Sequence, residues 1–226
     1  RNQYAPMAGW PPLCDAIAAK VRALYGRTVS AADEVTVTSG GTEALFCAVQ
    51  AVVRAGDEVI LLEPAYDSYE PAVELAGGRA VRVPLRHPDF AVDWDRVRAA
   101  LSARTRLIII NSPHNPSGAI LTESDLDALT DLLRLSGTLV LSDEVYEHMI
   151  FDGRSHASML TRAELAERAF VVSSFGKTCH ATGWKIGYCV APPALTAEFR
   201  KVHQFVQFAV ATPIQAALAQ FLGECP

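Results

Sequence analysis

Two lysines eight positions apart, Lys177 and Lys185, lie in the stretch SSFGKTCHATGWKIGY, which follows a short apolar run. Gly176-Lys177-Thr178 is similar to the end of a nucleotide-binding loop, but that loop needs a glycine where this chain has Val171. A surface lysine needs no explanation, whereas a lysine buried at a strand end has a lowered pKa and can act as a nucleophile. Both interpretations of Lys177 are open at this point.

Other polar residues also follow apolar runs. Gly40-Gly41-Thr42 precedes a helical pattern, so its backbone N–H groups could hold an anion, although a tight turn explains it as well. Asp143 follows the run LVL, where a carboxylate usually has a cation or hydrogen-bond donors nearby. Asn115 lies in NSPHNPSG, for which a plain turn is the simpler interpretation. Tyr66 and Tyr69 could be aromatic residues packed on a sheet.

Short β-branched runs alternate with helical patterns, which predicts the elements that must position these residues. Strands are expected at residues 34–39, 57–63, 79–85, 105–111, 137–143, 168–174 and 185–192. Helices are expected at residues 42–56, 66–78, 93–103, 122–137 and 213–222. Thr122 and Asp125 predict a capping box, and residues 1–13 are expected to form an irregular lead-in.

The predicted strands are apolar throughout, which is typical of strands buried on both faces. We therefore predict a three-layer α/β/α fold around a mostly parallel seven-stranded sheet. Residues 185–192 follow the preceding strand so closely that they are expected to form its one antiparallel strand. In such sheets ligands bind beyond the carboxyl ends of the strands. Five polar turns follow strands and should meet there: SGGT, EPAYDSY, NSPHNPSG, SDEVY and SSFGK.

Composition excludes several classes of protein. The 226 residues are 50% hydrophobic and 20% charged with a net charge of −5, which argues against disorder and against nucleic-acid binding. The apolar runs are too short to cross a membrane. Five dispersed cysteines and six histidines show no metal-ligand spacing, so we expect reduced thiols, a cytoplasmic protein and no metal site.

The strings PHNPSG, SDEVY and SFGKT followed by TGWKIG occur in this order, and together they give the chain a family resemblance. The chain resembles the fold-type I aminotransferases that use pyridoxal 5′-phosphate (class I/II aminotransferases), and among them the methionine, kynurenine and glutamine transaminase group. The resemblance runs over essentially the whole chain. It implies that residues 1–226 form the cofactor-binding large domain, as a fragment that lacks the N-terminal arm and most of the C-terminal small domain.

The resemblance also implies roles for individual residues around the cofactor ring. Lys177 would form the Schiff base and then move protons as the catalytic base. Asp143 would pair with the pyridine nitrogen, and Tyr66 would stack on the ring face. Asn115 and Tyr146 would hydrogen-bond the phenolic oxygen.

A second implied group of residues would bind the cofactor phosphate. Its members in this chain are Gly41, Thr42, Ser174 and Lys185. Tyr4 matches a tyrosine that crosses a dimer interface to the phosphate of the neighbouring subunit. The resemblance therefore implies a homodimer with shared active sites.

The implied reaction moves an amino group from an L-amino acid, of the methionine, glutamine or aromatic type, to a 2-oxo acid. A pyridoxal-phosphate-dependent carbon–sulfur β-lyase would use the same residues and differ in how it holds the substrate side chain. A ligand-sensing domain of a transcription regulator would need a winged-helix segment upstream. The arginine that would bind the substrate carboxylate is expected C-terminal to these residues, and the preferred amino acid stays open.

Overall fold

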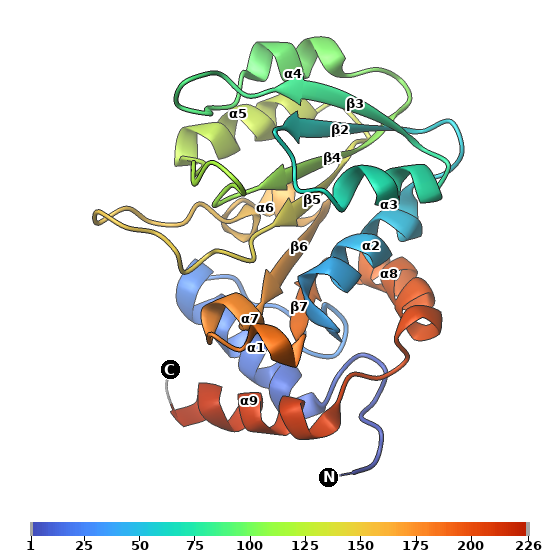
Figure 1. Cartoon of the computed structure of the whole chain (residues 1–226), viewed down its shortest axis with the longest axis vertical. Helices are drawn as coiled ribbons and strands as arrows, with labels where there is room; N and C mark the ends of the chain where they lie inside the picture. Colours follow the sequence, from blue (N-terminus) through green and yellow to red (C-terminus); the bar gives the residue numbers. More distant parts are fainter. Residues whose placement is uncertain (1, 225–226) are drawn as a thin grey trace.

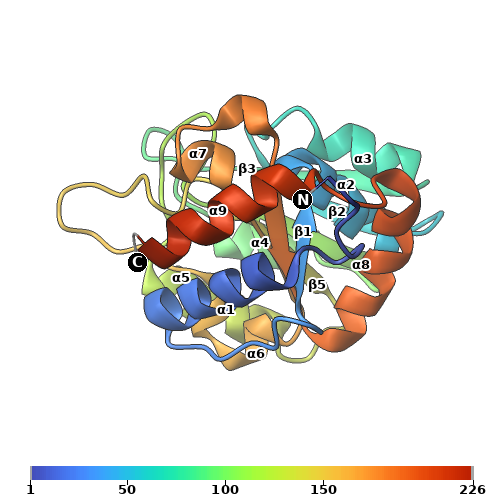
Figure 2. The same cartoon turned by 90° about the horizontal axis from the view of Figure 1, so that it is seen from below.

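The computed structural model describes residues 2–224, so Cys225, one of the five thiols, lies outside them. Within that range seven strands form one sheet in the order β1-β7-β6-β5-β4-β2-β3. Figure 1 labels β3 to β7 along this order, and Figure 2 labels β1. The strands are β1 (Val35–Thr38), β2 (Glu58–Glu63), β3 (Arg79–Pro84), β4 (Thr105–Asn111), β5 (Leu139–Asp143), β6 (Ala169–Ser174) and β7 (Gly187–Val190). Strand β7 runs antiparallel to both of its neighbours, β1 and β6, and all the other strand pairs are parallel, which confirms the predicted sheet.

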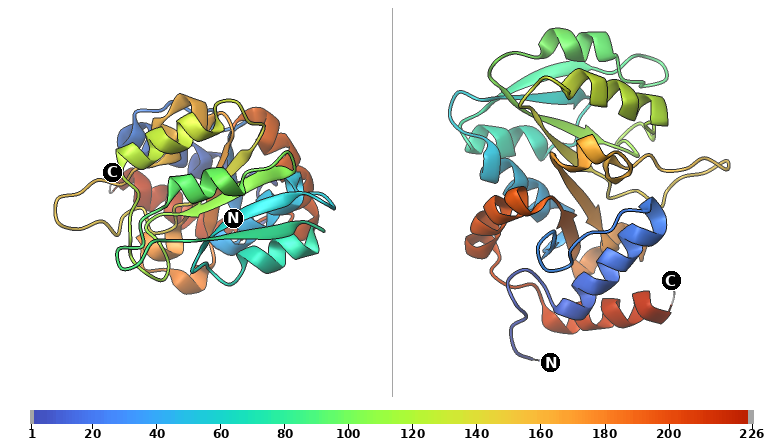
Figure 3. Two further views of the ribbon diagram at one scale, coloured as in Figure 1. Left: turned by 90° about the horizontal axis from the view of Figure 1, so that it is seen from above. Right: turned by 180° about the vertical axis from the view of Figure 1, so that it is seen from behind.

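Helices cover both faces of the sheet, as Figures 1 and 3 show from the front, from behind and from above. One face carries α1 (Pro11–Tyr25), α4 (Trp94–Ala100), α5 (Glu123–Leu133) and α6 (Ala163–Ala166). The other carries α2 (Gly40–Val52), α3 (Tyr69–Leu75) and α8 (Pro193–Val206). The short helix α7 (Phe175–Thr178) directly follows β6. The three-layer α/β/α prediction is therefore confirmed.

The alternation of side chains along each strand explains why the strands are apolar throughout. In β2, Ile60 packs into the cluster on the α1 and α5 face, whereas Val59 and Leu61 pack into the cluster on the α2 and α8 face. Successive side chains of a strand point to opposite faces, so a sheet with helices on both sides has no polar face.

The two ends of the chain agree with the sequence prediction only in part: the helix expected at residues 213–222 is present, whereas part of the expected irregular lead-in is helical. Helix α1 begins at Pro11, inside the segment expected to be irregular, because proline is well tolerated at the first helical position. The terminal helix α9 (Thr212–Glu224) lies along α1, as Figure 2 shows from below. Helix α8 was not predicted. Helix α2 ends at Val52, four residues before the expected end, because Val53 is already extended.

The sheet brings distant residues to one edge. Asn111 of β4 is in register with Asp143 of β5, so two polar strand ends are adjacent. Gly187 of β7 lies against the start of α2, because a Cβ atom added there would be 2.9 Å from the carbonyl carbon of Gly40. Only glycine permits this approach of the two backbones.

The predicted capping box at the start of α5 gives a direct test of the fold. The Thr122 side chain accepts from the Asp125 backbone N–H, and the Asp125 side chain accepts from the Thr122 N–H. We expect Thr122→Ala to lower the free energy of unfolding by about 1 kcal/mol, measured by urea denaturation, because it leaves an N-terminal donor of the helix unpaired. Thr122→Ser should keep most of this stability, and an equal loss in both variants would contradict the assignment.

Candidate active site

A cavity of about 300 Å³ opens at the carboxyl edge of the sheet. It is lined by residues from all five polar turns that follow predicted strands. Nine residues assigned to the site from the sequence line it: Gly41, Thr42, Tyr66, Asn115, Asp143, Tyr146, Ser174, Lys177 and Lys185. The structure therefore brings these nine together, while their individual roles stay predictions.

Asp143 ends β5 with a buried carboxylate that lacks a close cation among the described residues. The Tyr69 hydroxyl donates to its Oδ2 at 2.7 Å, and the Val145 N–H donates to its Oδ1 at 3.3 Å. Burial raises the pKa of Asp143 to about 6 although these hydrogen bonds lower it. The charged form of this carboxylate is thus only partly compensated, and a cationic group in the cavity would stabilise it.

Tyr69 is a site residue whose role the sequence did not reveal. It lies in the first turn of α3, and its hydroxyl reaches Asp143 across 74 positions of sequence. Its ring packs edge-on against Tyr66 with the ring centroids 5.7 Å apart. The only sequence signal was the spacing of two tyrosines by three positions, which places them on one side of a helical turn.

Lys177 lies in α7, in the turn that directly follows β6. Its Nζ is 5.2 Å from the centroid of the Tyr146 ring, within the range of a cation–π contact. The side chain lines the same cavity as Asp143, so an amine and a buried carboxylate share one space. The interpretation of Lys177 as an ordinary surface lysine does not fit this position.

The start of α2 and Lys185 form a cradle suited to an anion. Helix α2 begins at Gly40, which has a positive φ of 78°, and its first three residues line the cavity. A Cβ atom added at Gly40 would lie 3.4 Å from the Lys185 Nζ, so the amine sits against the helix start. A helix N-terminus, an ammonium group and the Ser174 hydroxyl make a donor set that fits a phosphate.

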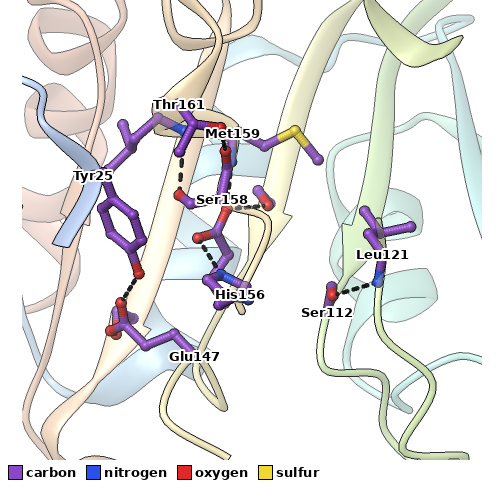
Figure 4. Close-up of polar contacts among 12 residues, drawn as sticks. Tyr25, Ser112, Leu121, Glu147, His156, Ser158, Met159 and Thr161 are labelled. Atoms are coloured by element: carbon purple, nitrogen blue, oxygen red, sulfur yellow. Dashed lines mark hydrogen bonds and ion pairs between the residues drawn. The ribbon is translucent and has the colours of Figure 1, made fainter. Parts of the chain in front are cut away.

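Asn115 is held in place by its neighbours. Its backbone N–H donates to the Asn111 Oδ1 at 2.7 Å, and the Asn111 amide donates to the Asp143 carbonyl at 2.9 Å. Farther along the loop, the Ser112 hydroxyl accepts from the Leu121 N–H at 3.0 Å, as Figure 4 shows. Asn111 also lines the cavity, and sequence analysis missed it because a polar residue at a strand end is common.

Tyr4 does not line this cavity. Its side chain is 82% exposed and packs edge-on against Phe208, with the ring centroids 5.5 Å apart. An exposed position is compatible with a contact to a second subunit. The expected role of Tyr4 stays a prediction.

One group in residues 2–224 combines three possible metal ligands, Glu43, Cys47 and His203. Glu43 Oε1 lies 2.9 Å from both Cys47 Sγ and His203 Nδ1, while His203 Nε2 lies 3.0 Å from the Met7 carbonyl oxygen. The three side chains therefore satisfy one another, and none of them lines the cavity. The expected absence of a metal stays a prediction.

Two further findings concern the whole chain. The four cysteines within residues 2–224 are free thiols. None of the helices in this range combines the length and the apolar character needed to cross a membrane.

The fold and the cavity define an α/β protein with a lysine, a buried carboxylate and an anion cradle at the carboxyl edge of its sheet. The chain belongs to the aminotransferase class I and II family, whose family model matches residues 1–224. This family is generally dependent on pyridoxal phosphate.

Relatives of this chain carry aminotransferase names. The chain is 53% identical over 225 residues to methionine aminotransferase from Escherichia coli, covering 100% of this chain and 58% of the relative. It is 37% identical over 229 residues to rat kynurenine–oxoglutarate transaminase 3, covering 97% and 50%. The chain thus spans about half the length of these relatives.

Solved structures agree with the sequence comparison. The E. coli protein YbdL, described as having a methionine aminotransferase function, superposes with a TM-score of 0.98 at 53% identity, covering 100% of this chain and 60% of that one. Aromatic aminotransferase from Pyrococcus horikoshii superposes with a TM-score of 0.94 at 36% identity, covering 98% and 60%. The expected family resemblance is confirmed.

Because the pKa of Asp143 is raised, we expect the free energy of unfolding of the cofactor-free protein to fall as pH rises. The unfolded carboxyl titrates near 3.8 and the folded one at about 6, so the favourable proton binding of the folded state is lost as pH rises between these values. At pH 7 we expect Asp143→Asn to have a free energy of unfolding about 2 to 3 kcal/mol larger than that of the wild type, and therefore a higher melting temperature. The difference should shrink toward pH 4, and a pH-independent difference would contradict burial of this charge.

Proposed function

We propose that the full-length protein is a pyridoxal-phosphate-dependent aminotransferase that moves an amino group from an L-amino acid to a 2-oxo acid. The observation that carries this proposal is the meeting of eight residues from five separate turns, together with Lys185, around one cavity, with Lys177 and Asp143 among them. Family membership and the aminotransferase names of the relatives support the same reaction.

In the proposed site, Asp143 is the partner of the cofactor's pyridine nitrogen. Its carboxylate is buried and lacks a cation in direct contact among the described residues, so a protonated ring nitrogen would be a favourable neighbour. Tyr69 holds the carboxylate through its hydroxyl, which fixes the direction in which the charge acts. When bound, the cofactor supplies an electron sink for the negative charge left on the substrate's α-carbon.

Lys177 is the proposed covalent attachment point and the base that moves the α-proton. Its amine lies over the Tyr146 ring and lines the cavity that also contains Asp143, which places it in the space proposed for the cofactor. Asn115 and Tyr146 are the proposed donors to the phenolic oxygen, and Tyr66 is the proposed stacking partner of the ring. Preset donors of this kind need no rearrangement during the reaction.

The proposed phosphate site comprises the start of α2, Ser174 and Lys185. Backbone N–H groups of Gly41 and Thr42 at the helix start and the fixed charge of Lys185 suit a dianion. Lys185 would thus bind the cofactor without taking part in the chemistry.

We also propose a cytoplasmic homodimer whose subunits share active sites. Several large apolar side chains are exposed near the chain ends, among them Tyr4, Phe205 and Phe208, which are 82%, 86% and 51% exposed. Such a patch favours burial against another protein surface. The free thiols favour a reducing compartment. Residues 1–226 would then form the cofactor-binding large domain of a longer chain.

Methionine, glutamine or aromatic amino acids are the proposed amino donors. Relatives with methionine and kynurenine transaminase names support this range. An assay with these donors should show amino transfer that requires a 2-oxo acid. Release of pyruvate and ammonia without any 2-oxo acid would instead indicate a carbon–sulfur β-lyase.

Borohydride trapping tests the proposed attachment. Reduction of the purified full-length protein with bound pyridoxal phosphate should add one cofactor to Lys177, identified by peptide mass spectrometry. Among residues 2–224, Lys177 is the one lysine that shares the cavity with Asp143 away from the phosphate cradle. Lys177→Ala should abolish the labelled peptide and nearly all amino transfer. Labelling at Lys185, or no labelling of the wild type, would overturn the proposal.

Loss of the fixed charge should separate binding from chemistry. We expect Lys185→Ala to weaken pyridoxal phosphate binding by about tenfold or more, measured by cofactor titration, with a smaller fall in kcat at saturating cofactor. Lys201→Ala is the matched control, because this exposed lysine of α8 pairs with Glu198 and does not line the cavity. A fall in kcat that exceeds the loss of affinity would contradict a purely binding role.

A further inference from the structure

A buried carboxylate outside the cavity, Glu147, receives polar contacts from three other elements. On α1, the Lys20 Nζ lies 2.6 Å from its Oε1. The Tyr25 hydroxyl of the same helix donates to Oε2, as Figure 4 shows. The Ser173 hydroxyl of β6 also donates to Oε1, and the Tyr188 hydroxyl of β7 lies 3.3 Å from the same atom. One side chain therefore joins α1, β6 and β7.

Members of this cluster adjoin proposed site residues along the chain. Glu147 directly follows Tyr146, whose ring lies 5.2 Å from the Lys177 Nζ. Ser173 directly precedes Ser174, which lines the phosphate end of the cavity. The bond between Ser173 and Glu147 thus fixes two cavity-lining segments relative to each other.

The contact with β7 extends this linkage to the start of α2. Tyr188 follows Gly187, and a Cβ atom added at Gly187 would lie 3.0 Å from the Gly41 backbone nitrogen. Because these backbones are already in close contact, a shift of β7 would move the first N–H groups of α2. Glu147 is therefore connected to both the ring end and the phosphate end of the cavity.

The charge of Glu147 makes these bonds strong. Burial would raise its pKa, but Lys20 and the hydrogen bonds from Ser173 and Tyr25 outweigh burial and lower the pKa to about 2. The side chains of Lys20 and Glu147 are 12% and 3% exposed. Hydrogen bonds to an ionised group are stronger than neutral ones, and a buried pair loses much when one member is removed.

We propose that Glu147 is a positioning residue for pyridoxal phosphate binding: its carboxylate keeps Tyr146, Ser174 and the start of α2 in fixed relative positions. This inference rests on the proposed function. The competing explanation is that Glu147 only fastens α1 to the sheet, in which case its loss would lower stability and leave cofactor binding unchanged.

The test uses the apo form of the full-length protein and a titration with pyridoxal phosphate. Glu147→Gln keeps the shape of the side chain, and we expect it to weaken cofactor binding by about tenfold. The pH midpoint of the bound-cofactor absorption should also rise, by about half a unit or more. A less well directed Tyr146 hydroxyl would leave more negative charge on the phenolic oxygen of the cofactor. That charge favours the protonated form of the bound cofactor, so the pH midpoint rises.

A matched pair of variants separates positioning from the attachment of α1. Ser173→Ala and Tyr25→Phe each remove one hydroxyl donor to the same carboxylate, on the β6 side and on the α1 side. We expect Ser173→Ala to follow Glu147→Gln in both readouts. Tyr25→Phe should lower the melting temperature and keep the affinity within about twofold of the wild type. If Glu147→Gln does not fold, this pair decides the question.

Two outcomes would overturn the inference. In the first, Glu147→Gln and Ser173→Ala bind the cofactor with wild-type affinity and absorption. In the second, Tyr25→Phe weakens binding as much as Ser173→Ala does. Failure of the wild type itself to bind pyridoxal phosphate would instead overturn the proposed function, so the two failures are distinguishable.

Discussion

The negative charge at the end of β5 is the constraint around which the site is built. Asp143 lies between β4 and β6 in the sheet, and its buried carboxylate accepts the Tyr69 hydroxyl at 2.7 Å. A neutral side chain would be easier to bury there, because a charge without a counterion loses its hydration. A cationic ligand in the cavity would compensate the buried charge. The carboxylate, which is unfavourable for folding, is therefore accounted for by the proposed reaction.

Two buried carboxylates in the same short segment differ in whether a nearby cation compensates their charge. Asp143 has no cation in contact among the described residues and a pKa raised to about 6, whereas Glu147 pairs with Lys20 and has a pKa lowered to about 2. Environments that shift the pKa values of two carboxylic acids in opposite directions suit the two acids to different roles. Glu147 is compensated within the chain and serves the structure of the site, while Asp143 is left available to a ligand.

The architecture makes this arrangement possible because parallel strands end on the same side. Residues from β4, β5 and β6 therefore meet although tens of positions separate them in the chain. The antiparallel strand β7 adds a contact at Gly187, where its backbone lies close to the start of α2. The start of α2 is the proposed phosphate site. Two solved structures share this fold at TM-scores of 0.98 and 0.94.

The sequence by itself determined the positions of the strands along the chain, the three-layer arrangement and nine of the residues that line the cavity. The strands and layers follow from local patterns of apolar runs, whereas the nine site residues were assigned through the family resemblance of short motifs at strand ends. Only the tertiary structure decided that Tyr69 reaches Asp143, that Asn111 holds Asn115, and that Lys20 neutralises Glu147. The physical reason is that these contacts depend on the orientation and burial of side chains that are distant in the sequence, which no local pattern encodes. They form only when the helices pack on the sheet.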